Sequence, residues 1–330
     1  MKTRPTALIS GITGQDGSFL AEQLLGRGYR VVGLHRRLSS VNHWRISHIE
    51  GLELACVDLL DLSSLLDVVR NVKPDEIYNL AAQSFVPASW SQPTLTGDVT
   101  GLGAVRMLEA YRREAPDAKF YQASSSEMFG QALSSPQNEK TPFTPLSPYA
   151  CSKVYAHHMA VNYRKAYGLF ISCGTLFNHE SERRGLEFVT RKITAAAARI
   201  SKGLQDTLVL GDLSPRRDWG FAGDYTRAMQ AMLGATEPDD FVVASGTDYS
   251  VEDFVAASFD SLNLDWRNHV VSDERFYRKN ELSCLTGDSA YARSKLGWCP
   301  EVSFEGLVER MIEADVERAE AEKRYGLNFQ

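Results

Sequence analysis

The sequence has few cysteines, and no two of them form a closely spaced pair. Cys56, Cys151, Cys173, Cys284 and Cys299 are the five in a chain of 330 residues, and no CxxC motif occurs. An odd number of scattered cysteines argues against a disulfide framework and against a zinc site built on paired cysteines. We therefore expect reduced thiols, a cytoplasmic location and no bound metal.

Long apolar runs and an excess of positive charge are absent as well. Apolar runs such as Ala195–Ala198 are far shorter than the about 20 residues that cross a bilayer. Met1–Ala7 has no basic start followed by an apolar stretch, which a secretory signal would have. The formal net charge is −6, whereas a nucleic-acid surface requires a basic stripe. We expect neither a membrane span nor a nucleic-acid partner, and an anion would have to be bound by local clusters of arginine.

The sequence does contain a regular alternation of short β-rich runs and helical patterns. The runs predict strands at Ala7–Ser10, Arg30–Leu34, Glu53–Val57, Glu76–Leu80, Lys119–Ala123 and Phe170–Thr175. Such alternation predicts an α/β fold of the Rossmann type, a doubly wound parallel sheet with helices on both faces. We place an NADP-binding domain at residues 1–177, with a return segment near 218–246, and a smaller, mixed α/β substrate-binding domain at residues 178–330.

The pattern is less regular in the second of these domains. Strands are predicted at Leu208–Leu210 and Phe241–Ala244, and helices at Thr190–Lys202, Gly223–Leu233 and Phe304–Tyr325. Ser250 and Asp253 have the spacing of a capping box, which predicts that another helix begins there.

A glycine-rich turn follows the first predicted strand and precedes a predicted helix. Glycine at its ends and centre lets the backbone turn tightly and approach a pyrophosphate, whose charge the helix N-terminus stabilises. The context of strand, turn and helix therefore predicts a dinucleotide site. Its residues are Gly11, Thr13, Gly14, Gln15, Asp16 and Gly17.

Two arginines stand about twenty residues further on, where an acidic residue would bind the ribose hydroxyls of NAD. Guanidinium groups at Arg36 and Arg37, followed by Ser39, suit a 2′-phosphate and favour NADP. The alternative is that both arginines are merely solvated. Further cofactor contacts are predicted where the next two strands end, at Asp58, Leu59, Leu80, Ala81 and Ala82.

Tyr149 and Lys153 lie one helical turn apart in the segment YACSK. A free phenol has a pKa near 10, which is too high for a base at neutral pH. A nearby ammonium favours the phenolate, so Tyr149 could accept a hydroxyl proton while a hydride leaves for nicotinamide. This pair at this distance from a dinucleotide motif resembles the signature of the extended short-chain dehydrogenase/reductase superfamily.

The segment SSSEMFG adds a hydroxyl and a carboxylate after the fifth predicted strand. Ser125 supplies the hydroxyl donor that oxidation and reduction at one carbon require. Glu127, two residues later, provides a second base, which that simpler chemistry does not need. The alternative role for Glu127 is that of a structural loop glutamate or helix-cap partner.

Seven segments resemble those of the GDP-mannose 4,6-dehydratases. In order they are GITGQDGSFL, NLAAQSFVPASW, SSSEMFG, SPYACSK, LFNHES, FVTRKI and RDWGFAGDY. They extend from Ala7 to about Tyr225. The resemblance implies a hydro-lyase of nucleotide-sugar metabolism that uses NADP to convert GDP-mannose into GDP-4-keto-6-deoxymannose and water.

The resemblance also implies roles for individual side chains. Tyr149 would deprotonate the C-4 hydroxyl, with Ser125 hydrogen-bonding the same oxygen, and Lys153 would position the cofactor ribose. Glu127 would remove the C-5 proton as the C-6 hydroxyl leaves. Arg184 is implied as a contact of the cofactor too, and the implied substrate contacts are Ser84, Asn178, Arg184, Val189, Lys192, Arg217, Arg278 and Glu281.

Other functions remain open at this point. An epimerase or reductase of nucleotide sugars would use Tyr149, Lys153 and Ser125 but not Glu127, and an enzyme that also reduces the 4-keto product is a further alternative. A non-catalytic NADP-sensing scaffold would not need the tyrosine–lysine pair. The resemblance implies a homodimer or homotetramer, with Arg36–Ser40 near a subunit contact.

Overall fold

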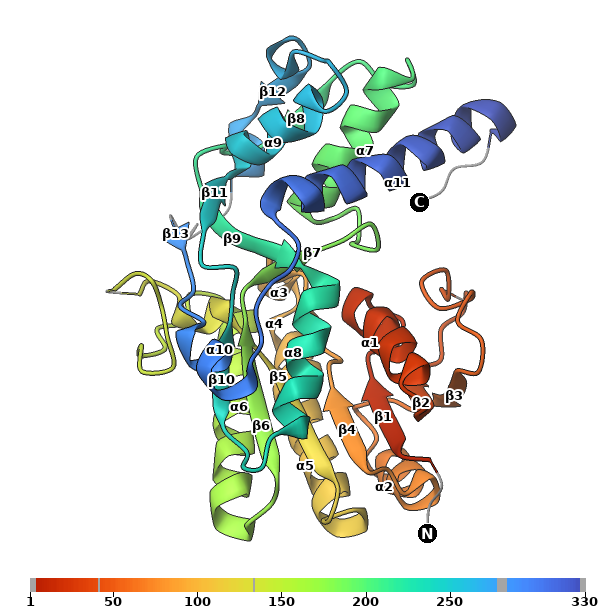
Figure 1. Cartoon of the computed structure of the whole chain (residues 1–330), viewed down its shortest axis with the longest axis vertical. Coiled ribbons are helices and arrows are strands. Elements are labelled where there is room, and N and C mark those ends of the chain that lie inside the picture. Colours follow the sequence, from red (N-terminus) through yellow and green to blue (C-terminus); the bar gives the residue numbers. More distant parts are fainter. Residues whose placement is uncertain (1–3, 41, 133, 278–283, 327–330) are drawn as a thin grey trace.

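The computed structural model describes residues 4–40, 42–132, 134–277 and 284–326 (Figure 1). Its largest element is a seven-stranded sheet with the strand order β10-β6-β5-β4-β1-β2-β3, in which every neighbouring pair is parallel. The strands are β1 (Thr6–Ser10), β2 (Arg30–His35), β3 (Glu53–Cys56), β4 (Glu76–Asn79), β5 (Lys119–Ser125), β6 (Ile171–Leu176) and β10 (Asp240–Val243). The predicted doubly wound parallel sheet is thus confirmed, and the strand order reverses between β1 and β4 as in Rossmann folds.

Helices cover both faces of this sheet, because successive side chains of a buried strand point to opposite faces. Ala7 and Ile9 pack into one apolar cluster, whereas Leu8 between them packs into the other. The first cluster is covered by α1 (Gln15–Gly26), α8 (Ala222–Gly234) and α10 (Ala290–Leu296). The second is covered by α2 (Leu62–Val72), α5 (Gly103–Glu114) and α6 (Pro148–Tyr167).

A second region lies beyond the carboxyl ends of the sheet strands (Figure 1). Its core is a separate apolar cluster. It contains β7 (Asn178–Glu180), β9 (Arg216–Phe221), β11 (Asp248–Ser250) and β13 (Cys284–Leu285) in one small sheet, and β8 (Leu208–Leu210) with β12 (Val270–Ser272) in another. Its helices are α7 (Val189–Ser201), α9 (Val251–Asp260) and α11 (Phe304–Tyr325).

The predicted elements of this region agree with the structure to within a residue or two. The strand at Leu208–Leu210 and the helix at Phe304–Tyr325 have the predicted bounds, and Ser250 and Asp253 form the predicted capping box before α9. The short strands β7, β9, β11, β12 and β13 were not predicted. Four of them are only two or three residues long, too short to show strand periodicity, and β9 begins with three charged residues, Arg216-Arg217-Asp218.

Short helical segments complete the fold. α3 (Val86–Ser91), α4 (Pro93–Thr96) and the π-helix η1 (Gly97–Leu102) connect β4 to α5, and the 3-10 turn η2 (Ser126–Phe129) follows β5. Two further 3-10 turns, Trp266–Asn268 and Glu274–Phe276, flank β12. Among the described residues, no helix has the length and apolar character that spanning a membrane requires.

Candidate active site

A cleft of about 1110 Å³ lies at the carboxyl ends of the parallel strands, between the large sheet and the second region. It brings together most of the predicted site residues. Those that line it are Gly11, Thr13, Gly14, Gln15, Asp16, Gly17, Arg36, Asp58, Leu59, Leu80, Ala81, Ala82, Ser84, Ser125, Glu127, Tyr149, Lys153, Asn178, Arg184, Val189, Lys192 and Arg217.

Four predicted residues are not among the residues that line the cleft. Arg37 and Ser39 are exposed and lie outside its wall. Arg278 and Glu281 lie outside the described residues.

The glycine-rich turn forms a close backbone cradle at one end of the cleft. Its turn is closed by a hydrogen bond from the Gly14 amide to the Gly11 carbonyl, at 3.0 Å. A Cβ on Gly17 would lie 2.5 Å from the Gly11 carbonyl oxygen, and one on Gly11 would lie 2.9 Å from the amide nitrogen of Ala81. Only glycine fits these positions, and the first turn of α1 begins beside them at the cleft wall.

His179 is a residue of this site that the sequence analysis did not identify. Its Nε2 lies 2.9 Å from Oδ2 of Asp16 in the first turn of α1, and its Nδ1 lies 2.7 Å from the carbonyl oxygen of Phe177. Gln15 donates a hydrogen bond to the His179 carbonyl at 3.0 Å. These contacts attach β7 to the glycine-rich turn, and the segment LFNHES that contains His179 was the available signal.

Arg45 is a second residue that the sequence analysis missed. It lines the cleft and donates hydrogen bonds to the backbone carbonyls of Arg183, at 2.6 Å, and Thr13, at 3.4 Å. Burial, together with the charges of Arg191 and Arg184, lowers the pKa of Arg45 to about 10. A guanidinium concentrated among other cations is suited to an anionic ligand. No spacing in the sequence connects Arg45 to the glycine-rich turn.

The four predicted catalytic side chains converge at the centre of the cleft. Ser125 is the last residue of β5 and the N-cap of η2. Its Oγ accepts a hydrogen bond from the Glu127 amide at 3.3 Å. Tyr149 and Lys153 come from the first turns of α6, which begins at Pro148 after the N-cap Ser147. Tyr149 shares a hydrogen bond with Ser125. The Lys153 ammonium donates to the Ala123 carbonyl at 2.8 Å and lies 5.9 Å from the centre of the Tyr149 ring.

Burial controls the protonation of the tyrosine and the lysine. It raises the pKa of Tyr149 to about 12, and the hydrogen bond with Ser125 offsets only part of this rise. Burial also lowers the pKa of Lys153 to about 8. In this structure burial, and not the expected effect of the Lys153 ammonium, dominates the pKa of Tyr149.

Basic side chains of the second region also line the cleft. Arg184 packs over the Phe188 ring at 3.5 Å and lies 3.1 Å from Oε2 of the buried Glu180. Lys192 donates to the Val209 carbonyl at 2.7 Å, and burial lowers the pKa of its ammonium. Arg217, in β9, is buried at the cleft wall. Such groups can bind a diphosphate.

Aromatic side chains of the segment after β12 line the cleft as well. Phe276 and Tyr277 line the cleft and remain half exposed. The Lys192 ammonium lies 5.1 Å from the centre of the Phe276 ring. The sequence analysis did not identify either aromatic residue. The contact of Phe276 with Lys192 depends on the pairing of β12 with β8, which are far apart in the sequence.

Comparisons with known proteins identify close relatives over nearly the whole chain. A family model described as "GDP-mannose 4,6 dehydratase" matches residues 8–311. The chain is 52% identical to GDP-mannose 4,6 dehydratase 2 of Arabidopsis thaliana, covering 98% of this chain and 90% of the relative. It is 42% identical to a GDP-mannose 4,6-dehydratase of Vibrio cholerae, covering 95% and 94%. The solved structure of a Thermus thermophilus UDP-glucose 4-epimerase in complex with NAD is 25% identical, with a TM-score of 0.83 over 94% of this chain and 98% of that chain.

Proposed function

The chain belongs to the GDP-mannose 4,6-dehydratase family and is a hydro-lyase, and on this basis we propose its substrate, cofactor and catalytic residues. The substrate is GDP-mannose, and the products are GDP-4-keto-6-deoxymannose and water. The observation that carries this proposal is the placement of a carboxylate, Glu127, beside Ser125 and Tyr149 in one cleft. An epimerase needs the hydroxyl and the phenol but has no step for this carboxylate.

Tyr149 acts on the hydroxyl at C-4 of the mannose. Its phenolate accepts the hydroxyl proton, and Ser125, which already shares a hydrogen bond with Tyr149, binds the same oxygen. A bound nicotinamide supplies the acceptor for the C-4 hydride and later the donor to C-6. Lys153 keeps a positive charge near the phenol and holds the cofactor ribose.

Glu127 acts on the carbon chain next to the new ketone. The C-4 carbonyl makes the proton at C-5 acidic, and the carboxylate of Glu127 accepts it. The C-6 hydroxyl departs as water with the proton that Glu127 took from C-5, and a bound cofactor would return the hydride to C-6 while the proton held by Tyr149 goes to C-5. Hydrogen and charge balance over the whole reaction, so the cofactor is regenerated at each turnover.

We propose that NADP binds at the part of the cleft that the glycine-rich turn forms. The cradle formed by Gly11 and Gly17 has room for backbone contact with a pyrophosphate and none for a side chain. Arg36 lines the same cleft, where a guanidinium favours a 2′-phosphate over a free hydroxyl. We propose that Arg37 and Ser39 extend this contact, with Asp58 and Leu59 beside the adenine.

The cofactor preference can be tested with one substitution. We expect Arg36→Ala to weaken NADPH binding at least about tenfold and to leave NADH binding nearly unchanged, because the lost contact concerns only the 2′-phosphate. Fluorescence titration with both cofactors measures this difference. An equal loss for the two cofactors would contradict the assignment of Arg36 to the 2′-phosphate.

We propose that the substrate nucleotide binds where the second region lines the cleft. Arg184, Lys192 and Arg217 supply positive charge for its two phosphates, and Asn178, Ser84 and Val189 line the adjoining wall. Arg278 and Glu281 are proposed as further nucleotide contacts. Residues 1–177 with a return segment near 218–246 would form the cofactor domain, since β10 lies beside β6, and residues 178–330 the substrate domain.

We propose a homodimer or homotetramer as the active assembly. Trp90, Leu95, Leu102 and Tyr155 are large apolar side chains that remain exposed on α3, α4, η1 and α6. Leu38 and Trp44 are likewise exposed in the segment after β2. Exposed apolar side chains on neighbouring elements favour a subunit contact, and two of them, Trp90 and Leu95, also line the cleft.

Mass spectrometry of GDP-mannose incubated with the protein and NADP tests the proposed reaction. We expect the loss of one water, and Glu127→Gln should lower the rate at least about 100-fold because a general base is removed. Glu305→Gln, on the exposed start of α11, is the matched control and should leave the rate unchanged. A new isomer of equal mass would instead indicate an epimerase, and no new species would exclude this substrate.

A further inference from the structure

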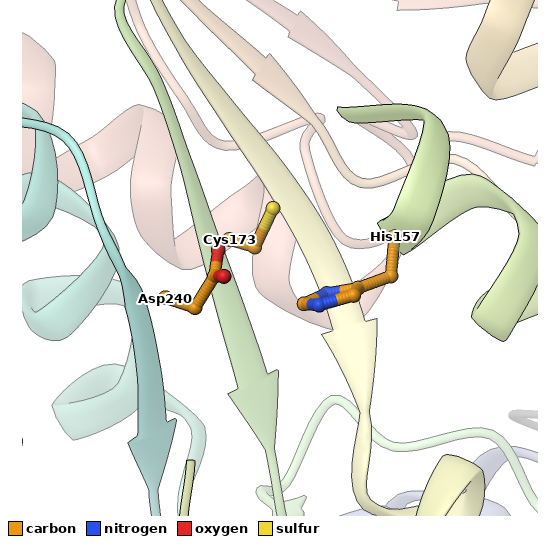
Figure 2. A group of neighbouring side chains, drawn as sticks. All are labelled: His157, Cys173 and Asp240. Carbon is orange, nitrogen blue, oxygen red and sulfur yellow. The ribbon is translucent and has the colours of Figure 1, made fainter. Parts of the chain in front are cut away.

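Three side chains with metal-binding atoms meet beside β5, β6 and β10 of the large sheet (Figure 2). His157 comes from α6, Cys173 from β6 and Asp240 from the start of β10. One imidazole nitrogen, the thiol sulfur and one carboxylate oxygen all lie within 4.8 Å of one another. Tetrahedral zinc with these ligands separates their atoms by about 3.5 Å, so shifts of about 1 Å would complete the geometry.

The groups around these three side chains have the arrangement found around metal ligands. Nδ1 of His157 lies 2.9 Å from Oγ of Ser124, which orients the ring and leaves Nε2 for an ion. Asp240 accepts hydrogen bonds from Nη1 and Nη2 of Arg164, at 3.1 and 3.0 Å. A ligating carboxylate commonly keeps such an outer partner.

A second cavity, separate from the catalytic cleft, opens onto this cluster. Its volume is about 420 Å³, and His157 and Asp240 form part of its wall. Glu139 and Thr141 line it as well, together with the exposed His158 and Lys165. The cavity provides an entry path for a hydrated ion and space for a water as the fourth ligand.

We propose that His157, Cys173 and Asp240 form a binding site for a zinc-class divalent cation, with its open position toward the second cavity. Imidazole, thiolate and carboxylate are the ligands that zinc takes, whereas magnesium and calcium require oxygen ligands almost exclusively. Binding replaces the hydrogen bond between the Cys173 thiol and Asp240 with a thiolate–metal bond and releases the thiol proton to solvent. Arg164 stays beside Asp240 as an outer partner, and its positive charge makes the site weaker than the same three ligands would be alone.

The sequence contains no signal for this site because the ligands are separated by 16 and 67 residues, at positions 157, 173 and 240. Metal-ligand spacing within a motif is recognisable only when one turn or helix supplies several ligands. Here the parallel pairing of β10 with β6, which aligns Asp240 with Cys173, and the packing of α6 bring the ligands together.

Cobalt titration of the full-length protein, freed of metal with a chelator, tests the proposal. We expect one Co²⁺ per chain, with the charge-transfer absorption of a cobalt–thiolate bond and the intense visible bands of a four-coordinate ion, and displacement of both signals by Zn²⁺. Cys173→Ser should abolish the charge-transfer band and weaken binding at least about tenfold. His157→Gln should weaken binding similarly, so the result does not depend on the folding of a single variant.

Cys299→Ser is the matched control, since Cys299 is an exposed cysteine far along the chain from the cluster. It should leave the cobalt spectrum and the affinity unchanged. Absence of a thiolate band in the unmodified protein would overturn the proposal. So would a band that persists in Cys173→Ser or disappears in Cys299→Ser.

Discussion

His179 and Asp16 form a half-buried ion pair that joins β7 to the glycine-rich turn, with 2.9 Å between Nε2 and Oδ2. Both ring nitrogens of His179 face acceptors, the Asp16 carboxylate and the Phe177 carbonyl, so the doubly protonated ring satisfies both. Although burial favours the neutral ring, the charge and hydrogen bond of Asp16 raise the pKa of His179. Burial likewise opposes the charge of Asp16, but His179 holds the pKa of that carboxyl below its ordinary value.

This pair predicts a pH-dependent contribution to stability. A raised histidine pKa contributes stability that is complete below the unfolded value of 6.5 and is lost as pH rises through the folded pKa. A lowered aspartate pKa contributes stability that is present above 3.8 and is lost as pH falls through the folded pKa. We expect the melting temperature of the unmodified protein to exceed that of His179→Asn most between about pH 4 and 6.5, with a smaller difference at higher pH. A difference that stays constant from pH 5 to 9 would show that His179 is neutral in the folded protein.

The catalytic pair predicts how activity depends on pH. The phenol of Tyr149, with its pKa raised to about 12, ionises more readily as pH rises, so kcat/KM should increase from pH 6 toward 8. Lys153, whose pKa is lowered to about 8, loses its charge above that value, and the increase should then flatten. Initial rates across this range, with the folded fraction checked at each pH, measure the profile. Tyr149→Phe should be inactive throughout, and a profile that falls from pH 6 to 8 would refute this assignment.

Gly17 and Gly26 lie in the same helix, α1, and we expect a change to alanine to have opposite effects at the two positions. A Cβ on Gly17 would meet the Gly11 carbonyl oxygen at 2.5 Å and the Ile12 Cα at 2.7 Å, both backbone atoms. Gly17→Ala should therefore cost about 1–3 kcal/mol of unfolding free energy and weaken NADPH binding. Gly26 has nothing within 4 Å of such a Cβ, so Gly26→Ala should be neutral or stabilising by up to about 1 kcal/mol. Denaturant unfolding compares the two, and equal effects would contradict the close backbone cradle.

Two ion pairs between the α7 segment and α11 predict very different contributions to stability. Arg191 and Asp315 are buried, with 2.6 Å between Nη2 and Oδ1, and Thr194 donates to the same carboxylate. Asp315→Asn would leave a buried guanidinium without its counter-charge, and we expect a cost of about 3–5 kcal/mol. Lys202 and Glu320 pair at the surface, so Glu320→Gln should leave the stability nearly unchanged. Chemical denaturation of both variants distinguishes them, and similar losses would mean that the inner pair is hydrated.

Several features could be predicted from local sequence because local interactions decide them. The six strands from Thr6 to Leu176 are runs of apolar and β-branched residues bounded by turns, so their positions follow from composition and periodicity. Ser125 and Glu127 lie two residues apart, and Tyr149 and Lys153 one helical turn apart. Each pair therefore reaches the same cleft once the adjoining strand or helix forms.

Other features depend on contacts between distant segments. β9 contains Arg216-Arg217-Asp218 and was not predicted as a strand, yet its pairing with β7, β11 and β13 makes it one. The pKa of Tyr149 was expected to follow the nearby ammonium, but the extent of burial, which no spacing specifies, determines it.

The sequence by itself determined the strands of the large sheet, the glycine turn and the residues that we propose as catalytic groups, since these rest on residues close together in the chain. The tertiary structure decided which distant residues meet: Asp16 with His179, Arg45 with Thr13, and His157 with Cys173 and Asp240. The physical reason is that a residue's identity sets its chemistry, whereas its charge state and partners depend on the burial and neighbours that packing creates.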